Sequence, residues 1–123
     1  MADPEKLVFM VTHGPEHPEH ATIPFVMAAA ALASDVRVVL GFQAEGVELM
    51  RAGVADGVEA PGFPPLQKLL VDVRELGGQL LVCGPCIKSR GIVAPDDLVE
   101  GAEVVAAARF IAEITSATNS LVY

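Results

Sequence analysis

Two cysteines separated by two residues are the strongest candidates for chemistry in this chain. The motif Cys83-Gly84-Pro85-Cys86 follows the apolar run Leu80–Val82, which predicts a buried strand, and it precedes Lys88 and Arg90. Backbone N–H groups at a helix start and nearby cations lower the pKa of a thiol. The thiolate is the form that attacks sulfur, peroxide or a metal. The pattern predicts a nucleophilic Cys83 with a lowered pKa that reacts faster than Cys86; the alternative for Cys83 is a small, buried packing residue.

Cys86 has three possible roles at this stage: a resolving thiol, half of a metal site, or packing on the next helical turn. Cys-Gly-Pro-Cys is also the redox motif of thioredoxins, where it lies near the start of the chain after a tryptophan. This chain has no tryptophan, and only 37 residues follow Cys86. We therefore do not expect a thioredoxin.

Three histidines and two cations are further candidates. His13 follows a predicted strand at the sheet edge where α/β proteins bind ligands, so we expect it to belong to the site; His17 and His20 are expected at the surface. Arg90 and, less strongly, Lys88 could stabilise a thiolate or an anion such as thiosulfate. One Cys-x-x-Cys pair is only half of a structural zinc site, and Pro15 and Pro18 break any helical spacing of the histidines. We predict no metal and no cofactor.

Composition places the chain in a broad class. Its 123 residues predict one domain over 1–123, with 52% hydrophobic residues and a mean hydropathy of +0.48. The apolar run 23–33 is too short to span a bilayer, and the first residues lack the basic region of a signal peptide. A net charge of −8 argues against a nucleic-acid binder. Two closely spaced cysteines fit a reducing compartment, so we expect a cytoplasmic protein.

Apolar runs and breakers predict alternating strands and helices. Such alternation predicts an α/β protein with a parallel sheet covered on both faces. Leu66, Leu69, Leu70, Val73 and Leu76 follow helical spacing after Pro64-Pro65, and Gly77-Gly78 ends that helix. Strands are expected at 7–11, 36–40, 79–83, 103–105 and 120–123, and helices at about 18–34, 47–52, 64–76 and 106–116, with one helical turn at 95–98.

Several stretches, taken together, carry a family resemblance over essentially the whole chain. They are Val11-Thr12-His13-Gly14-Pro15 with Ala21–Phe25, Gly46–Leu49, Cys83–Ile92, and Gly101–Val104. Together they resemble the DsrE/DsrF-like family, and the stretch from Cys83 to Arg90-Gly91-Ile92 is the most specific part.

This resemblance implies a three-layer α/β/α fold around a mostly parallel five-stranded sheet, and homo- or hetero-oligomers, often trimers or hexamers. Well-understood members of the family pass sulfane sulfur as a cysteine persulfide. Their relay cysteine precedes an Arg-Gly or similar pair by about eight residues, which corresponds here to Cys83. Cys86 departs from that pattern, because many relay members have a small residue there.

Three functions remain open from the sequence. The first is a sulfurtransferase-like relay that carries sulfur on Cys83 between donor and acceptor proteins or small sulfur compounds. The second is a dithiol redox or peroxidase-like protein that uses Cys83 and Cys86. The third is a non-enzymatic oligomeric binding protein. A homotrimer or homohexamer is expected in each case, and whether the chain is an enzyme stays open.

Overall fold

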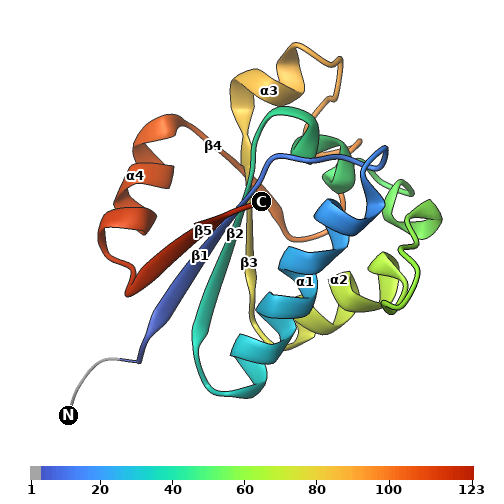
Figure 1. Ribbon diagram of the computed structural model, residues 1–123. Helices are drawn as coiled ribbons and strands as arrows, with labels where there is room; N and C mark the ends of the chain where they lie inside the picture. The colour runs from blue at the N-terminus through green and yellow to red at the C-terminus, as the bar shows by residue number, and fades with distance from the viewer. Residues whose placement is uncertain (1–3) are drawn as a thin grey trace.

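The computed structural model describes residues 4–123, which form five parallel strands flanked by helices (Figure 1). The strand order across the sheet is β4-β3-β2-β1-β5, and every pairing is parallel. The predicted α/β class and five-stranded sheet are confirmed. The strands are β1 (Lys6–Val11), β2 (Arg37–Phe42), β3 (Gln79–Cys83), β4 (Ala102–Val105) and β5 (Asn119–Val122).

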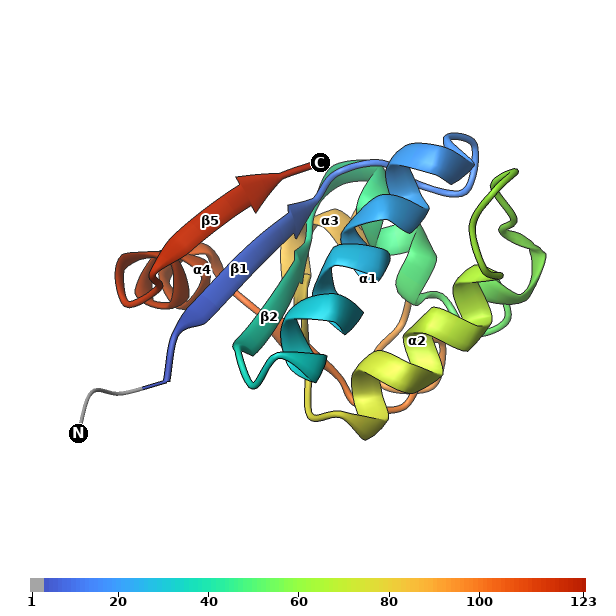
Figure 2. The same cartoon turned by 60° about the horizontal axis from the view of Figure 1, so that its bottom comes forward.

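The helices form two layers on opposite faces of the sheet (Figure 2). The helices α1 (Pro18–Ala33) and α2 (Leu66–Glu75) cover one face, and α4 (Ala107–Thr115) covers the other. This is the predicted three-layer arrangement. Among residues 4–123, no helix has both the length and the apolar character that a bilayer crossing needs.

Side chains along each strand alternate between the two layers, as the pleat requires. Phe9 and Leu40 lie in the larger core under α1 and α2, whereas Val8 and Leu81 pack with Phe110 of α4. Each strand of the middle of the sheet therefore buries both of its faces. This explains why these strands appear in the sequence as continuous apolar runs.

The ion pair between Lys6 and Glu113 ties α4 to the first strand. Lys6 Nζ contacts Glu113 and also donates to Ser116 Oγ at 2.8 Å, while Arg109 Nε donates to the same Glu113 carboxylate at 2.7 Å. The hydrogen bond from Lys6, and more weakly that from Arg109, lowers the pKa of Glu113. Two cations thus hold one carboxylate at the junction of β1 and α4.

The short segments differ most from their predictions. The helix expected at 47–52 is a 3₁₀ helix, η1 (Ala44–Met50), and a second one, η2, covers Ala55–Gly57. The expected turn of helix at 95–98 is a hydrogen-bonded turn, and Leu98 pairs with Arg51 in an isolated antiparallel bridge. Short segments have weak periodicity, so local contacts decide their form.

Candidate dithiol site

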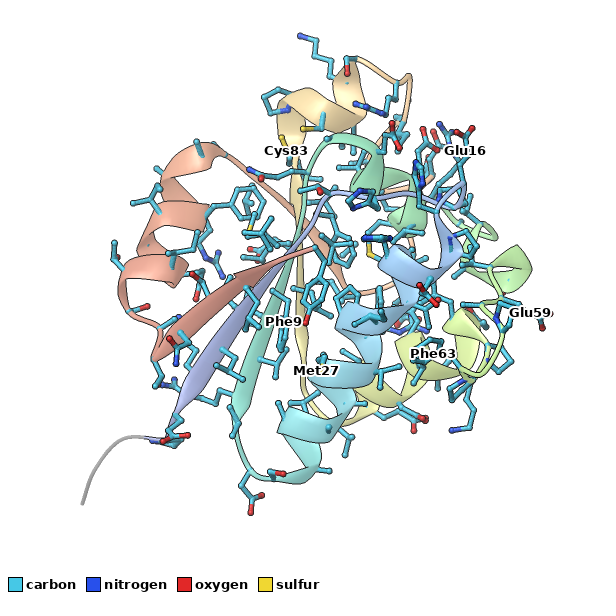
Figure 3. The ribbon with its side chains drawn as sticks, in the orientation of Figure 1. Phe9, Glu16, Met27, Glu59, Phe63 and Cys83 are labelled. Atoms are coloured by element: carbon cyan, nitrogen blue, oxygen red, sulfur yellow. The ribbon has the colours of Figure 1, made fainter. Side chains whose placement is uncertain are left out.

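The two cysteines lie at the carboxyl edge of the sheet, where β3 ends. Cys83 is the last residue of β3 (Figure 3). Cys86 lies in the single turn α3 (Gly84–Lys88), with Pro85 in its first turn. Proline is tolerated there because a first-turn N–H has no partner within the helix. Both cysteines are free and half-buried. The structure thus brings together the two thiols that the sequence singled out.

The backbone of the neighbouring strand end supplies a hydrogen bond to this pair. The N–H of Ala44 donates to Cys86 Sγ at a distance of 3.4 Å. Ala44 follows β2 and has a φ of 51°, in the left-handed region that residues with a Cβ rarely adopt. The sequence analysis missed Ala44, since an alanine side chain gives no signal of this backbone conformation or of the donor it presents.

The environment of Cys83 has the opposite effect to the one predicted. Burial raises the pKa of the Cys83 thiol, and its hydrogen bond to the Cys86 side chain raises the pKa further. The backbone N–H of Cys86 and the charge of Arg90 lower it, but they do not prevail. The prediction of a lowered pKa is wrong because α3 has only five residues, and because the strand end is partly desolvated.

The two predicted cations have different positions. Arg90 is half-buried, and its Nη1 donates to the backbone oxygen of Cys86 at 3.2 Å, so it braces the turn that carries the thiol. Arg51, which the sequence analysis did not identify, donates to the backbone oxygen of Arg90 at 3.4 Å and pairs with Glu48 at 2.9 Å. Lys88 is exposed at the end of α3.

His13 is the centre of a histidine cluster rather than a direct partner of the thiols. Its ring lies 4.7 Å from that of His20 and 5.3 Å from that of His17, centroid to centroid. His17 Nε2 lies 3.8 Å from Glu45 Oε2. In the described part of the chain, neither His13 nor Lys88 makes a side-chain hydrogen bond with a cysteine, and no three side chains form a metal-binding group. His17 and His20 are exposed, in agreement with the prediction.

A parallel α/β sheet with a half-buried dithiol at its carboxyl edge defines a protein whose candidate chemistry is that of thiols. The model of the DsrE/DsrF-like family matches residues 5–123, and the chain belongs to this family. The resemblance found in the motifs is therefore confirmed, and the family is associated with sulfur relay.

Relatives and solved structures agree with this membership. The chain is 30% identical to the uncharacterized protein MJ0989 of Methanocaldococcus jannaschii over 119 residues, covering 96% of this chain and 99% of the relative. It is also 31% identical over 107 residues to the uncharacterized protein MJ0760 of the same organism, covering 87% of this chain; the matched region is 38% of that longer protein.

Two solved structures share the fold. The ychN protein from E. coli gives a TM-score of 0.80 at 20% identity, covering 97% of this chain and 99% of its own. The protein MTH1491 from Methanobacterium thermoautotrophicum gives a TM-score of 0.69 at 18% identity over the same shares of each chain. At these identities the two structures show only that the fold is shared.

Proposed function

We propose that the protein is a sulfur-relay protein that carries sulfane sulfur as a persulfide on Cys83. The observation that carries the proposal is the half-buried pair of free thiols at the carboxyl edge of the sheet, in a chain of a family associated with sulfur relay. Cys83 also lies eight residues before Gly91 of the Arg-Gly pair, at the relay position of the resemblance. Donor and acceptor would be proteins or small sulfur compounds.

Loading requires that the Cys83 thiol lose its proton. This proton leaves to water or to the side chain of Cys86, which interacts with the Cys83 thiol. The Cys83 thiolate then attacks the sulfane sulfur of a donor, a new S–S bond forms, and the donor's S–S bond breaks. The leaving group departs with the electron pair, as sulfite if the donor is thiosulfate. Arg90, which braces the turn, and the exposed Lys88 would favour such an anionic donor. His13 remains a candidate ligand-binding residue of the same edge.

Mass spectrometry after treatment with polysulfide or thiosulfate tests the proposal. We expect a +32 Da adduct on Cys83 in the wild-type protein and in Cys86→Ser, and no adduct in Cys83→Ser. An adduct on Cys86 in Cys83→Ser at the wild-type yield would show that Cys83 is not the sulfur carrier. A protein that takes up no sulfur from either donor would contradict sulfur relay itself.

A dithiol redox or peroxidase-like function is the second candidate. It is favoured by the hydrogen bond between the two cysteines of the Cys-x-x-Cys pair. Residues three apart on a helical turn lie within the Cα separation of about 4.4–6.8 Å that a disulfide requires. In the experiment above, an internal disulfide without a persulfide adduct would favour this function. Because either chemistry needs reduced thiols, we propose a reducing compartment, the cytoplasm.

We also propose that the protein forms a homo-oligomer, a trimer or a hexamer. Large apolar side chains are exposed on α4 and on both outer strands of the sheet: Ile111 (58% exposed), Val104 (40%) and Val122 (72%). Permanent subunit interfaces are more apolar than ordinary surface. Light scattering at micromolar concentration is expected to give a multiple of the 12.8 kDa chain mass. A monomer mass alone would contradict the proposal.

A further inference from the structure

The turn that carries Cys86 is held by hydrogen bonds from two sides. The backbone oxygen of Cys86 accepts hydrogen bonds from Ser89 Oγ at 3.0 Å and from Arg90 Nη1 at 3.2 Å. On the other side, the turn between β2 and η1 contacts the same residue, because the N–H of Ala44 donates to Cys86 Sγ at 3.4 Å. The position of Cys86 therefore depends both on η1 and on the segment that directly follows α3.

Arg51 connects these two supports. Its Nε lies 2.9 Å from Glu48 Oε2 and its Nη2 lies 3.3 Å from Glu48 Oε1, so the guanidinium bonds to both oxygens of one carboxylate of η1. The same Nη2 donates to the backbone oxygen of Arg90 at 3.4 Å. A guanidinium that forks onto a carboxylate in this way has a fixed orientation. Arg51 therefore presents a donor of defined direction to the segment that ends the cysteine turn.

The backbone of Arg51 is fixed as well. Arg51 directly follows η1 and pairs with Leu98 in the isolated antiparallel bridge. The N–H of the next residue, Ala52, donates to the backbone oxygen of Asp97 at 2.8 Å. The side chains of Arg51 and Glu48 are only 35% and 27% exposed, so solvent screens their ion pair less than it screens a fully exposed pair. Because Arg51 is anchored at both its backbone and its side chain, it transmits the position of η1 to the segment after α3.

We infer that Arg51 is a positioning residue of the dithiol site. Through the backbone oxygen of Arg90, it holds the turn in which the two thiols stay within reach of each other. A restrained turn has already lost conformational entropy that a free segment would lose when the two sulfurs join. The restraint therefore favours a bond between Cys83 and Cys86 over a bond from either of them to a thiol from outside.

For its consequence in sulfur transfer, this inference rests on the proposed function. Attack of Cys86 on a Cys83 persulfide needs the same approach of the two sulfurs as formation of their disulfide, so Arg51 favours both. The effect of Arg51 on the two thiols themselves involves no sulfur donor, and it can be measured without one.

Equilibration of the protein with mixtures of reduced and oxidised glutathione tests the inference. Cys83 and Cys86 give up two electrons and two protons and form a disulfide, while one glutathione disulfide becomes two glutathione thiols. We expect the equilibrium constant for the protein disulfide to fall about three- to tenfold in Arg51→Lys, which keeps the charge but loses the fork. Arg74→Lys is the matched control and should leave the constant unchanged. Arg74 Nη1 also donates to a backbone oxygen, that of Glu100 at 2.9 Å, but this contact precedes β4 at the opposite edge of the sheet from the thiols.

Glu48→Gln is a second variant that acts on the same contact from its other end. It removes the charge that orients Arg51, so it should lower the equilibrium constant as well. Adding Glu48→Gln to Arg51→Lys should lower the constant little further, because both changes act through one contact. Urea unfolding of the reduced proteins shows which variants are folded under the conditions of the measurement, and either single variant suffices for the test.

Two results would overturn the inference. The first is an equilibrium constant that stays at the wild-type value in the folded variants, or that falls equally in Arg74→Lys. The second is loss of folding in both Arg51→Lys and Glu48→Gln, because Arg51 would then stabilise the whole fold rather than position the turn. Since the measurement involves no persulfide, either result is distinct from a failure of the protein to take up sulfur.

Discussion

Replacing Gly46 with alanine is expected to lower the free energy of unfolding by about 2–3 kcal/mol, a large share of the 5–15 kcal/mol typical of a domain. The new Cβ would lie 2.0 Å from the Val11 backbone oxygen and 2.7 Å from its carbonyl carbon. Both are backbone atoms of a strand that pairs with β2 and β5, so neither can turn away as a side chain would. The turn itself must move, and it would carry the Ala44 amide away from Cys86.

Urea unfolding measures the first effect, and Gly57→Ala is the matched control. Gly57 ends η2, is exposed, and has no atom within 4 Å of an added Cβ. Its substitution should leave the midpoint unchanged or raise it slightly, because alanine restricts the unfolded chain. Equal midpoints for the two variants, at equal slopes, would mean that the close contact at Gly46 relaxes without cost.

Most of the fold follows from local patterns in the sequence. The middle strands appear as apolar runs because both faces are covered, and α2 combines helical spacing with stop signals at Gly77-Gly78. The predicted boundaries of the five strands differ from the observed ones by one residue at most, except that β2 continues two residues beyond its predicted end, to Phe42. The secondary structure of the segments 47–52 and 95–98 was predicted less well, because it depends on contacts such as the bridge between Arg51 and Leu98.

The candidate site was predictable in its residues but not in its electrostatics. The motif predicted that Cys83 and Cys86 would lie at a strand end, and they do. The degree of burial at Cys83, which sets the direction of its pKa, depends on how α3 and η1 pack, and no local pattern records this. Ala44 acts through its backbone, so its residue type carries no sign of its position beside a thiol.

Replacing Cys86 with serine is expected to lengthen the lifetime of a Cys83 persulfide at least about tenfold while leaving its formation intact, because attack within one turn has a high effective concentration. In the wild type, the Cys86 thiolate attacks the inner sulfur of the Cys83 persulfide. A disulfide forms between the two cysteines, the bond to the terminal sulfur breaks, and that sulfur leaves with the electron pair as hydrosulfide. A dithiol reductant would then be needed to restore the free thiols.

Loading the protein with polysulfide, removing the donor and following the +32 Da adduct over time measures this lifetime. Released sulfide and the internal disulfide should appear together in the wild type and be absent in the variant. Cys86→Ala is the matched second variant: it also lacks the thiol, but unlike serine it offers no hydroxyl to the Ala44 amide. Both variants should keep the adduct equally long, since the lost nucleophile governs the decay. Decay at the wild-type rate in both would show that Cys86 does not resolve the persulfide, and would leave it as a proton acceptor for Cys83 or as packing against η1.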